Sequence, residues 1–208
     1  MSQHYILMGD IIRSHTYNAH ILRHEFMELV SSCNQEFERD ILSPYTVTLG
    51  DEFQGVSRSL LSLLNSIFYL EETALQRKLK FRMRLVAVYG LIDTPINEMK
   101  AHGMMGEGLT RARMILTDKR RSTTRFRFEL NDADMTKQLN RLFLVIDGLI
   151  LRWKPDEGPL ILDMVNNTNN ENVGNKYKKN RTQIWKRRKH LLIDEYRALK
   201  ETVLELAE

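Results

Sequence analysis

Residues 45–56 form the stretch YTVTLGDEFQGV, which decides the fold. β-Branched and aromatic side chains in 45–49 predict a strand, and Gly50-Asp51 predicts a turn into a second short strand over 52–56. The resulting hairpin carries Asp51 at its bend. A carboxylate at the end of a strand has a fixed direction, and Mg²⁺ prefers one or two such carboxylates together with substrate phosphates.

A second Gly-Asp pair, Gly9-Asp10, ends an earlier apolar run. Residues 5–8 predict a buried strand, and the spacing of apolar residues predicts a helix over 20–37 that crosses to the hairpin. We expect the two strands to be neighbours, so that Asp10 and Asp51 converge at one edge of the sheet and bind Mg²⁺ or Mn²⁺. The alternative is that both are turn residues, because Gly-Asp is common in turns.

Helices and strands alternate through the rest of the first 153 residues. Apolar spacing predicts helices over 60–76, 106–116 and 132–153, and strands over 81–90 and 125–130. The order β-α-β-β-α-β-α-β places helices on a mixed sheet. We therefore predict an α+β fold of the ferredoxin-like, palm type over residues 1–153.

A segment rich in helix breakers, KPDEGP at 154–159, marks the predicted domain boundary. Beyond it we expect an all-α unit over 154–208. Short helices are predicted over 160–165 and 173–178, with the asparagine-rich residues 166–172 as their connection. A tight turn at Lys179-Asn180 then leads into one long helix that runs from Arg181 to the C-terminus.

The composition, 42% hydrophobic and 28% charged in 208 residues, is that of a soluble globular protein. No run approaches the roughly 18 apolar residues that a membrane span needs, and the N-terminus lacks the apolar core of a signal peptide. We therefore expect a cytoplasmic protein. The single cysteine, Cys33, excludes an intramolecular disulfide and a multi-cysteine zinc site, and we expect its side chain to be buried.

Positive charge is concentrated in residues 174–190, which contain eight Lys or Arg and no Asp or Glu. Since the net charge of the chain is +4, the remainder carries −4. This asymmetry predicts a polyanionic partner, and the pattern helix, turn, helix predicts that the partner is DNA. The alternative is a solvated basic face that docks a protein or an anionic membrane.

In the helix-turn-helix interpretation, the second helix would lie in the major groove. Thr182 and Gln183 would reach base edges near its start, while Ile184 and Trp185 would partly anchor it. A homodimer would fit a palindromic site. The cations predicted to contact phosphates are Lys178, Lys179, Arg181, Lys186, Arg187 and Arg188.

The motifs resemble those of two known groups of proteins. LMGDIIRS at 7–14 and TLGDEF at 48–53 resemble the two metal motifs of class III nucleotidyl cyclases, and the second is also similar to the turn of GGDEF diguanylate cyclases. Over the whole chain, GDII at 9–12, TLGDEFQG at 48–55 and GEGLTRAR at 106–113 resemble the SatD family of small bacterial proteins. The chain departs from the cyclases at Thr110, where they carry an asparagine, and from GGDEF at Leu49, where a glycine is usual.

The cyclase resemblance implies a two-metal site in which Asp10 and Asp51 bind cations while a ribose hydroxyl attacks an α-phosphate. Arg111 or Arg113 would meet the developing negative charge. The backbone after the first strand would cradle phosphates, and the hydroxyls of Ser14 and Thr110 are further candidates for phosphate contact. The implied nucleotide-binding residues are Ile11, Ile12, Arg13, Ser14 and Thr110.

Three functions compete at this point. The leading hypothesis is a SatD-like regulator in which a cyclase-like domain binds a metal or nucleotide and a helix-turn-helix binds DNA. The second is an active nucleotidyl cyclase or nucleotidyltransferase whose basic tail only positions it. The third is an inert palm scaffold that binds another protein.

Overall fold

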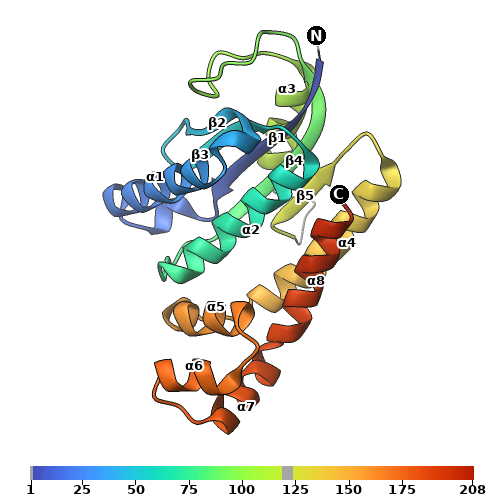
Figure 1. Cartoon of the computed structure of the whole chain (residues 1–208). Coiled ribbons are helices and arrows are strands. Elements are labelled where there is room, and N and C mark those ends of the chain that lie inside the picture. Colours follow the sequence, from blue (N-terminus) through green and yellow to red (C-terminus); the bar gives the residue numbers. More distant parts are fainter. Residues whose placement is uncertain (1, 119–123) are drawn as a thin grey trace.

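A computed structural model describes residues 2–118 and 124–208 and contains one five-stranded mixed sheet (Figure 1). The strands lie in the order β2-β3-β1-β4-β5, and each neighbouring pair is antiparallel except β4 and β5. The predicted α+β class is confirmed, as is the pairing of the first strand with the hairpin. The strands are β1 (Ser2–Ile11), β2 (Ile41–Val47), β3 (Glu52–Ser57), β4 (Met83–Ile92) and β5 (Phe126–Glu129).

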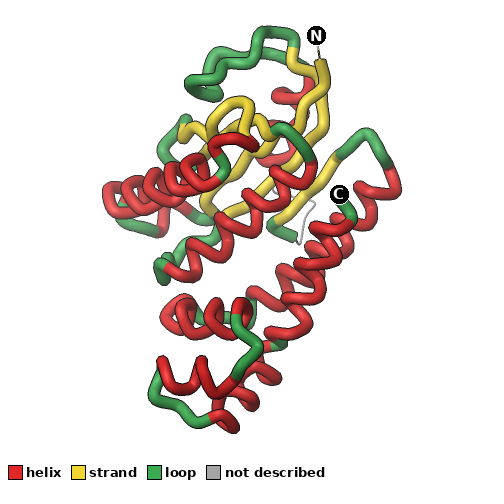
Figure 2. The backbone as a smooth tube through the Cα atoms, in the orientation of Figure 1, coloured by secondary structure: helices red, strands yellow, loops and turns green. Residues whose placement is uncertain are grey.

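Helices cover the sheet unequally on its two faces. Alternate residues of β1 point to opposite faces, so Leu7 and Ile11 join the large core with α1 and α2, whereas Ile6 and Met8 join a smaller cluster under α3. Figures 1 and 2 show α1 and α2 lying in front of the strands. The helices of this part are α1 (Ala19–Glu36), α2 (Leu60–Gln76), α3 (Glu107–Thr117) and α4 (Ala133–Ile150).

Side-chain caps fix where several helices begin. The Asn18 side chain accepts hydrogen bonds from the His20 and Ile21 N–H groups at the start of α1. Ser59 and Ser62 form a reciprocal capping box at the start of α2. These groups satisfy N–H donors that have no partner within the first turn of a helix, and so they stabilise the predicted starts.

The C-terminal helices differ from the prediction in two places. The expected long helix is wrong, because Leu192 adopts a left-handed conformation (φ 55°) that ends one helix and lets the next turn back onto α2, α4 and α5. The asparagine-rich connection is also shorter than predicted, since Asn169 caps a helix that starts at Asn170. The four helices are α5 (Gly158–Asn166), α6 (Asn170–Lys176), α7 (Arg181–Leu191) and α8 (Ile193–Glu205).

The C-terminal helices share one hydrophobic core with the sheet. Tyr196 of α8 packs between Phe68 of α2 and Trp153, and its hydroxyl donates to the Glu72 carboxylate at 2.9 Å. Gly158 lies directly against the backbone of α2, where a Cβ would come within 1.8 Å of the Leu75 carbonyl oxygen. The breaker-rich segment forms only a short turn of 3-10 helix (Pro155–Glu157), and the division into two domains at 153/154 stays a prediction.

A buried ionic cluster ties the elements of the sheet part together. The Arg125 guanidinium, before β5, donates to both Glu71 carboxylate oxygens of α2 at 2.9 and 3.0 Å and to Asp147 of α4 at 2.8 Å. It also donates to the Met83 carbonyl of β4 at 3.0 Å. Burial lowers the pKa of Arg125, but the two carboxylates outweigh it and the pKa is raised.

Cys33 is fully buried between α1 and α2, as predicted, and its thiol faces the Ser66 carbonyl. Burial raises the pKa of this thiol to about 12, although the contact with Ser66 acts in the opposite direction. Among the helices of the described chain, none is long and apolar enough to cross a membrane.

Candidate functional site at the strand ends and on the basic helices

The two Gly-Asp motifs meet where β1 and β3 lie side by side. Asp10 is the register partner of Glu52, and the Ile11 N–H donates to the Asp51 carbonyl at 2.9 Å. The structure therefore brings the two predicted metal-binding positions to one edge. Because directly opposed residues share a sheet face, the side chains of Asp10 and Glu52 both lie on the α3 side.

The Asp10 carboxylate already has a cationic partner. Asp10 is only 8% exposed, and one nitrogen of the Arg84 guanidinium donates to its two oxygens at 2.8 and 3.2 Å. The same nitrogen donates to the Leu116 carbonyl at the end of α3, at 3.3 Å. A divalent cation at Asp10 would have to compete with this guanidinium. Arg84 was missed from the sequence, because its place opposite Asp10 follows from the pairing of β1 with β4 and not from a local pattern.

The two arginines of α3 have different surroundings. Arg113 donates to the Glu52 carboxylate at 3.4 Å and to the Gln54 side-chain oxygen at 3.2 Å, which places it beside the strand ends. Arg111 instead forms an ion pair with Glu129 of β5. Residues two apart on a helix point in different directions, so of these two arginines only Arg113 lies beside the ends of β1 and β3. The Thr110 hydroxyl donates within the helix to the Gly106 carbonyl.

Part of the predicted phosphate cradle is wrong. The Ile11 N–H is bonded to Asp51 and the Ile12 N–H to the Arg82 carbonyl, at 2.9 and 2.8 Å, so neither is available to a phosphate. Arg13 follows in the left-handed conformation with φ 56°, and Ser14 begins a short 3-10 helix. Of the four residues expected after the first strand, Arg13 and Ser14 remain candidates.

A pocket of about 760 Å³ opens beside Arg113 and Gln54, between α3 and the loop that follows β4. Ligand pockets typically have volumes of about 300–1,000 Å³ and combine apolar walls with a few polar groups. This one has methionine and leucine walls, and its polar lining residues are Gln54, Asp93, His102, Thr110, Arg113 and Thr117. The lining residues are Met8, Gln54, Asp93, His102, Gly103, Met104, Met105, Gly106, Leu109, Thr110, Arg113, Met114 and Thr117.

The expected metal ligands do not form a larger chelating cluster. Within residues 2–118 and 124–208, no group of three or more His, Cys, Asp or Glu side chains could hold a metal ion. Binding of Mg²⁺ or Mn²⁺ stays a prediction.

The basic C-terminal segment divides into free and engaged cations. Lys178, Lys179, Arg181 and Lys186 are exposed, and within the described chain none of them has an ion-pair partner. Arg187 forms an ion pair with Glu157. Lys178 and Lys179 precede α7, Arg181 begins it and Lys186 lies in its middle.

Like Arg187, the expected DNA contacts Arg188 and Gln183 have structural partners. Arg188 is 4% exposed and donates to Asn170, to Asp194 and to the Met164 and Asn167 carbonyls, so its predicted phosphate contact is wrong. Its position four residues after buried Ile184 placed it on the inward face, which was the available signal.

The Gln183 side chain caps α7, because its oxygen accepts from the Asn180 N–H at 2.9 Å. This contact holds the side chain close to the turn that precedes α7, away from the middle of the helix. Thr182 is exposed beside it, and its contact with base edges stays a prediction. Trp185, expected to help anchor the helix, is 51% exposed, whereas Ile184 is fully buried.

Comparison with known proteins gives one family and one structural likeness. A profile described as the SatD family matches residues 4–198. A solved structure described as that of a bacterial light-regulated adenylyl cyclase is similar with a TM-score of 0.43 and 12% sequence identity, over 61% of this chain and 74% of the other. A search of curated proteins found no significant match.

Proposed function

The chain belongs to the SatD family. We propose that it is a regulator that binds DNA through its helical end, helices α5 to α8, and a nucleotide through its sheet end, where β1, β3 and α3 meet. The observation that carries the proposal is the group of four exposed cations, Lys178, Lys179, Arg181 and Lys186, on the turn and helix α7. A cation without an acidic neighbour is available for a phosphate, and each such contact releases counterions from DNA.

The start of α7 adds to the attraction for phosphates. Arg181 is the first residue of the helix, and Lys178 and Lys179 lie in the turn before it. The N-terminus of a helix carries partial positive charge, so the helix dipole and these side chains favour an anion at the same place. The engaged residues Arg187 and Arg188 hold α7 in position through α5, α6 and α8.

The test is salt-dependent binding of the full chain to DNA, measured by fluorescence anisotropy. The double variant Lys179→Ala, Lys186→Ala should weaken binding and make the slope of log K against log salt shallower by about 1.4 to 1.8, since each phosphate contact contributes about 0.7 to 0.9. Lys137→Ala, a change at an exposed lysine of α4, is the matched control. Binding that is absent at low salt would refute this half of the proposal.

The nucleotide at the sheet end is supported by the pocket beside Arg113. Its apolar walls suit a base, and Arg113 at the strand ends suits a phosphate. A phosphate group could also draw Arg84 away from Asp10, which would remove one cationic competitor of a metal ion bound to the same phosphates. Bound Mg²⁺ or Mn²⁺ would supply charge neutralisation there, with Asp10 and Asp51 as its protein ligands.

Calorimetric titration of each nucleoside triphosphate into the full chain, in the presence of Mg²⁺ or Mn²⁺, tests the nucleotide-binding half of the proposal. We expect Arg113→Ala and Asp51→Asn to weaken binding, while Asp134→Asn at the surface of α4 should not. Mass spectrometry of the same mixtures separates a binding protein from a cyclase or transferase, because turnover would yield a product that Asp10→Asn abolishes. Absence of heat with every nucleotide would favour the protein-binding scaffold instead.

A further inference from the structure

Trp185 lies in the middle of the outward face of α7. With 51% of its surface exposed, it is the only exposed large apolar side chain of helices α5 to α8. Arg181 and Lys189 are one turn before and one turn after it, and Lys186 is its neighbour. Lys189 is ion-paired with Asp194 at 3.1 Å, whereas Arg181 and Lys186 have no ion-pair partner in the described chain. An indole beside two unpaired cations, with no carboxylate on 181–190, is placed for a ligand that has both negative charge and flat apolar surface.

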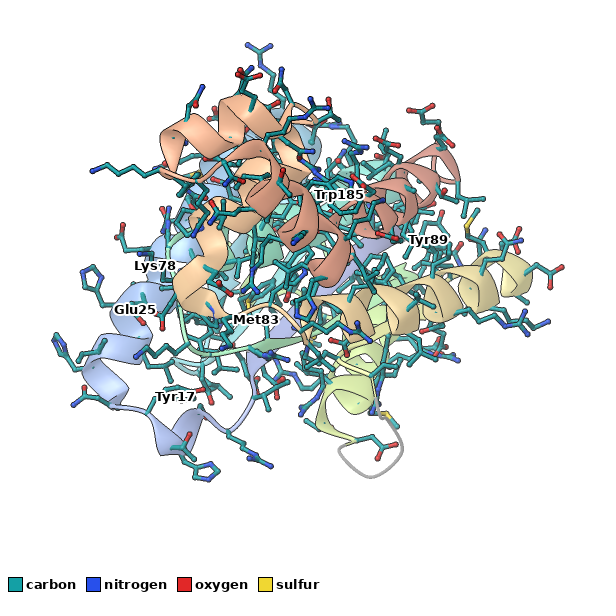
Figure 3. All side chains as sticks on the ribbon, turned by 90° about the horizontal axis from the view of Figure 1, so that it is seen from below. Tyr17, Glu25, Lys78, Met83, Tyr89 and Trp185 are labelled. Atoms are coloured by element: carbon teal, nitrogen blue, oxygen red, sulfur yellow. The ribbon has the colours of Figure 1, made fainter. Side chains whose placement is uncertain are left out.

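The direction of this indole is fixed by the inward side of the same helix. Ile184 and Leu191 are buried in the core and Arg188 is buried among four partners, so α7 cannot rotate to hide Trp185. In Figure 3 the C-terminal helices face the viewer, and Trp185 is labelled on them. Keeping a half-exposed indole in water has a hydrophobic cost that a ligand would remove.

Helix α7 is poorly suited to contacting base edges in duplex DNA. Such readout uses bidentate side chains such as glutamine near the start of the helix, but the Gln183 oxygen is bonded to the Asn180 N–H. Stacking has no such requirement, because every base has a flat face. Binding sites for single strands combine a cationic groove with aromatic side chains on which bases stack.

We propose that Trp185 is a stacking platform for an unpaired base, and that the helical end binds single-stranded DNA in preference to duplex DNA. The inference rests on the proposed function in that nucleic acid binds at α7. It names the form of the nucleic acid and gives Trp185 a role that differs from those of the neighbouring cations: the cations contact phosphates, and the indole contacts a base.

Trp185 fluorescence tests the contact directly. The other tryptophan, Trp153, is buried, so the variant Trp153→Phe leaves Trp185 as the single reporter in the full chain. Circular dichroism should first show that this variant keeps its fold. We expect a single-stranded oligonucleotide to quench the emission strongly and to bind at least about 10-fold more tightly than the duplex of the same sequence.

Binding variants separate stacking from charge. Trp185→Ala should weaken single-strand binding by roughly 5- to 100-fold with an unchanged salt slope, and Trp185→Phe should retain most of the affinity. Lys186→Ala should make the slope shallower by about 0.7. Met99→Ala, at an exposed apolar residue far along the chain, is the matched control and should change neither.

Two results would overturn the inference, and only the second would also refute the proposed DNA binding. Duplex binding as tight as single-strand binding, with no effect of Trp185→Ala, would refute the stacking role while leaving DNA binding by the helical end intact. Failure of both forms of DNA to bind at low salt would refute the proposed function of this end together with the inference.

Discussion

Replacing Arg125 with methionine is the sharpest test of how the sheet part is held together. The guanidinium joins α2, α4 and β4 through Glu71, Asp147 and the Met83 carbonyl, and the side chains of all three ionised groups are 6–10% exposed. Methionine fills similar space but removes the cation that is hydrogen-bonded to both carboxylates, and leaves the nearby Arg82 as the remaining positive charge beside Glu71 and Asp147. The stability lost in Arg125→Met is therefore mainly electrostatic, and less a matter of packing.

The expected magnitude follows from the burial. Removing one partner of a buried ion pair typically costs about 3–5 kcal/mol, because the remaining charge stays desolvated. Here one arginine serves two carboxylates, so we expect the upper part of that range for Arg125→Met. Arg125→Lys should cost less, since an ammonium keeps the charge but cannot form the two parallel hydrogen bonds to Glu71.

Urea unfolding followed by circular dichroism measures the effect. With a loss of about 4–5 kcal/mol and a slope of about 2–3 kcal/mol per molar urea, the midpoint of Arg125→Met should fall by about 1.3–2.5 M. Arg127→Met is the comparison, because Arg127 lies in β5, two residues after Arg125, and among the described residues it donates to the Ile115 and Asp118 carbonyls and to no carboxylate of β4 or α4. A loss below about 1 kcal/mol for Arg125→Met would show that the carboxylates are not desolvated as the structure indicates, and would refute the reasoning.

Two further predictions concern the core and the helix interface. Gly158→Ala should lower the free energy of unfolding by about 1–3 kcal/mol, because the added Cβ would overlap the Leu75 carbonyl. Gly148→Ala should raise it by about 1 kcal/mol, because Gly148 lies within α4 with open space around it. If urea unfolding gave changes of the same sign for both variants, this contrast would be contradicted. The pKa of Cys33 is about 12 in the folded chain and 9.0 as a free thiol, so its contribution to stability is present below pH 9 and decreases by up to about 1.4 kcal/mol per pH unit above it. Cys33→Ala should remove that part of the alkaline loss, and identical pH profiles for the two proteins would count against a buried neutral thiol.

Much of the fold was predictable because it depends on local patterns. The hairpin around Gly50-Asp51 and the crossover helix after Asp10 were enough to predict that the two motifs lie on neighbouring strands. The break at Leu192 was not predictable, because leucine disfavours a left-handed conformation and only the packing of α8 on α2 and α4 stabilises it there.

The candidate sites were less predictable than the fold. Asp10 and Asp51 were found from their motifs, but the ion pair between Asp10 and Arg84 joins residues 74 positions apart, and no local pattern reports it. The eight cations of 174–190 looked equivalent along the chain. Their roles differ because α7 turns one side toward the core, where Arg188 is buried, and the other toward water, where Trp185 is exposed.

By itself, the sequence determined the strand and helix periods, the position of the two carboxylates at strand ends, the family resemblance and the concentration of positive charge near the C-terminus. Periodicity and composition act over a few residues, so a single sequence carries them directly. Only the tertiary structure decided that Arg84 occupies the Asp10 carboxylate, that Arg113 and not Arg111 serves the strand ends, and that Trp185 faces outward. Those outcomes depend on which distant side chains compete for the same space and charge, and that competition is settled only when the whole chain is packed.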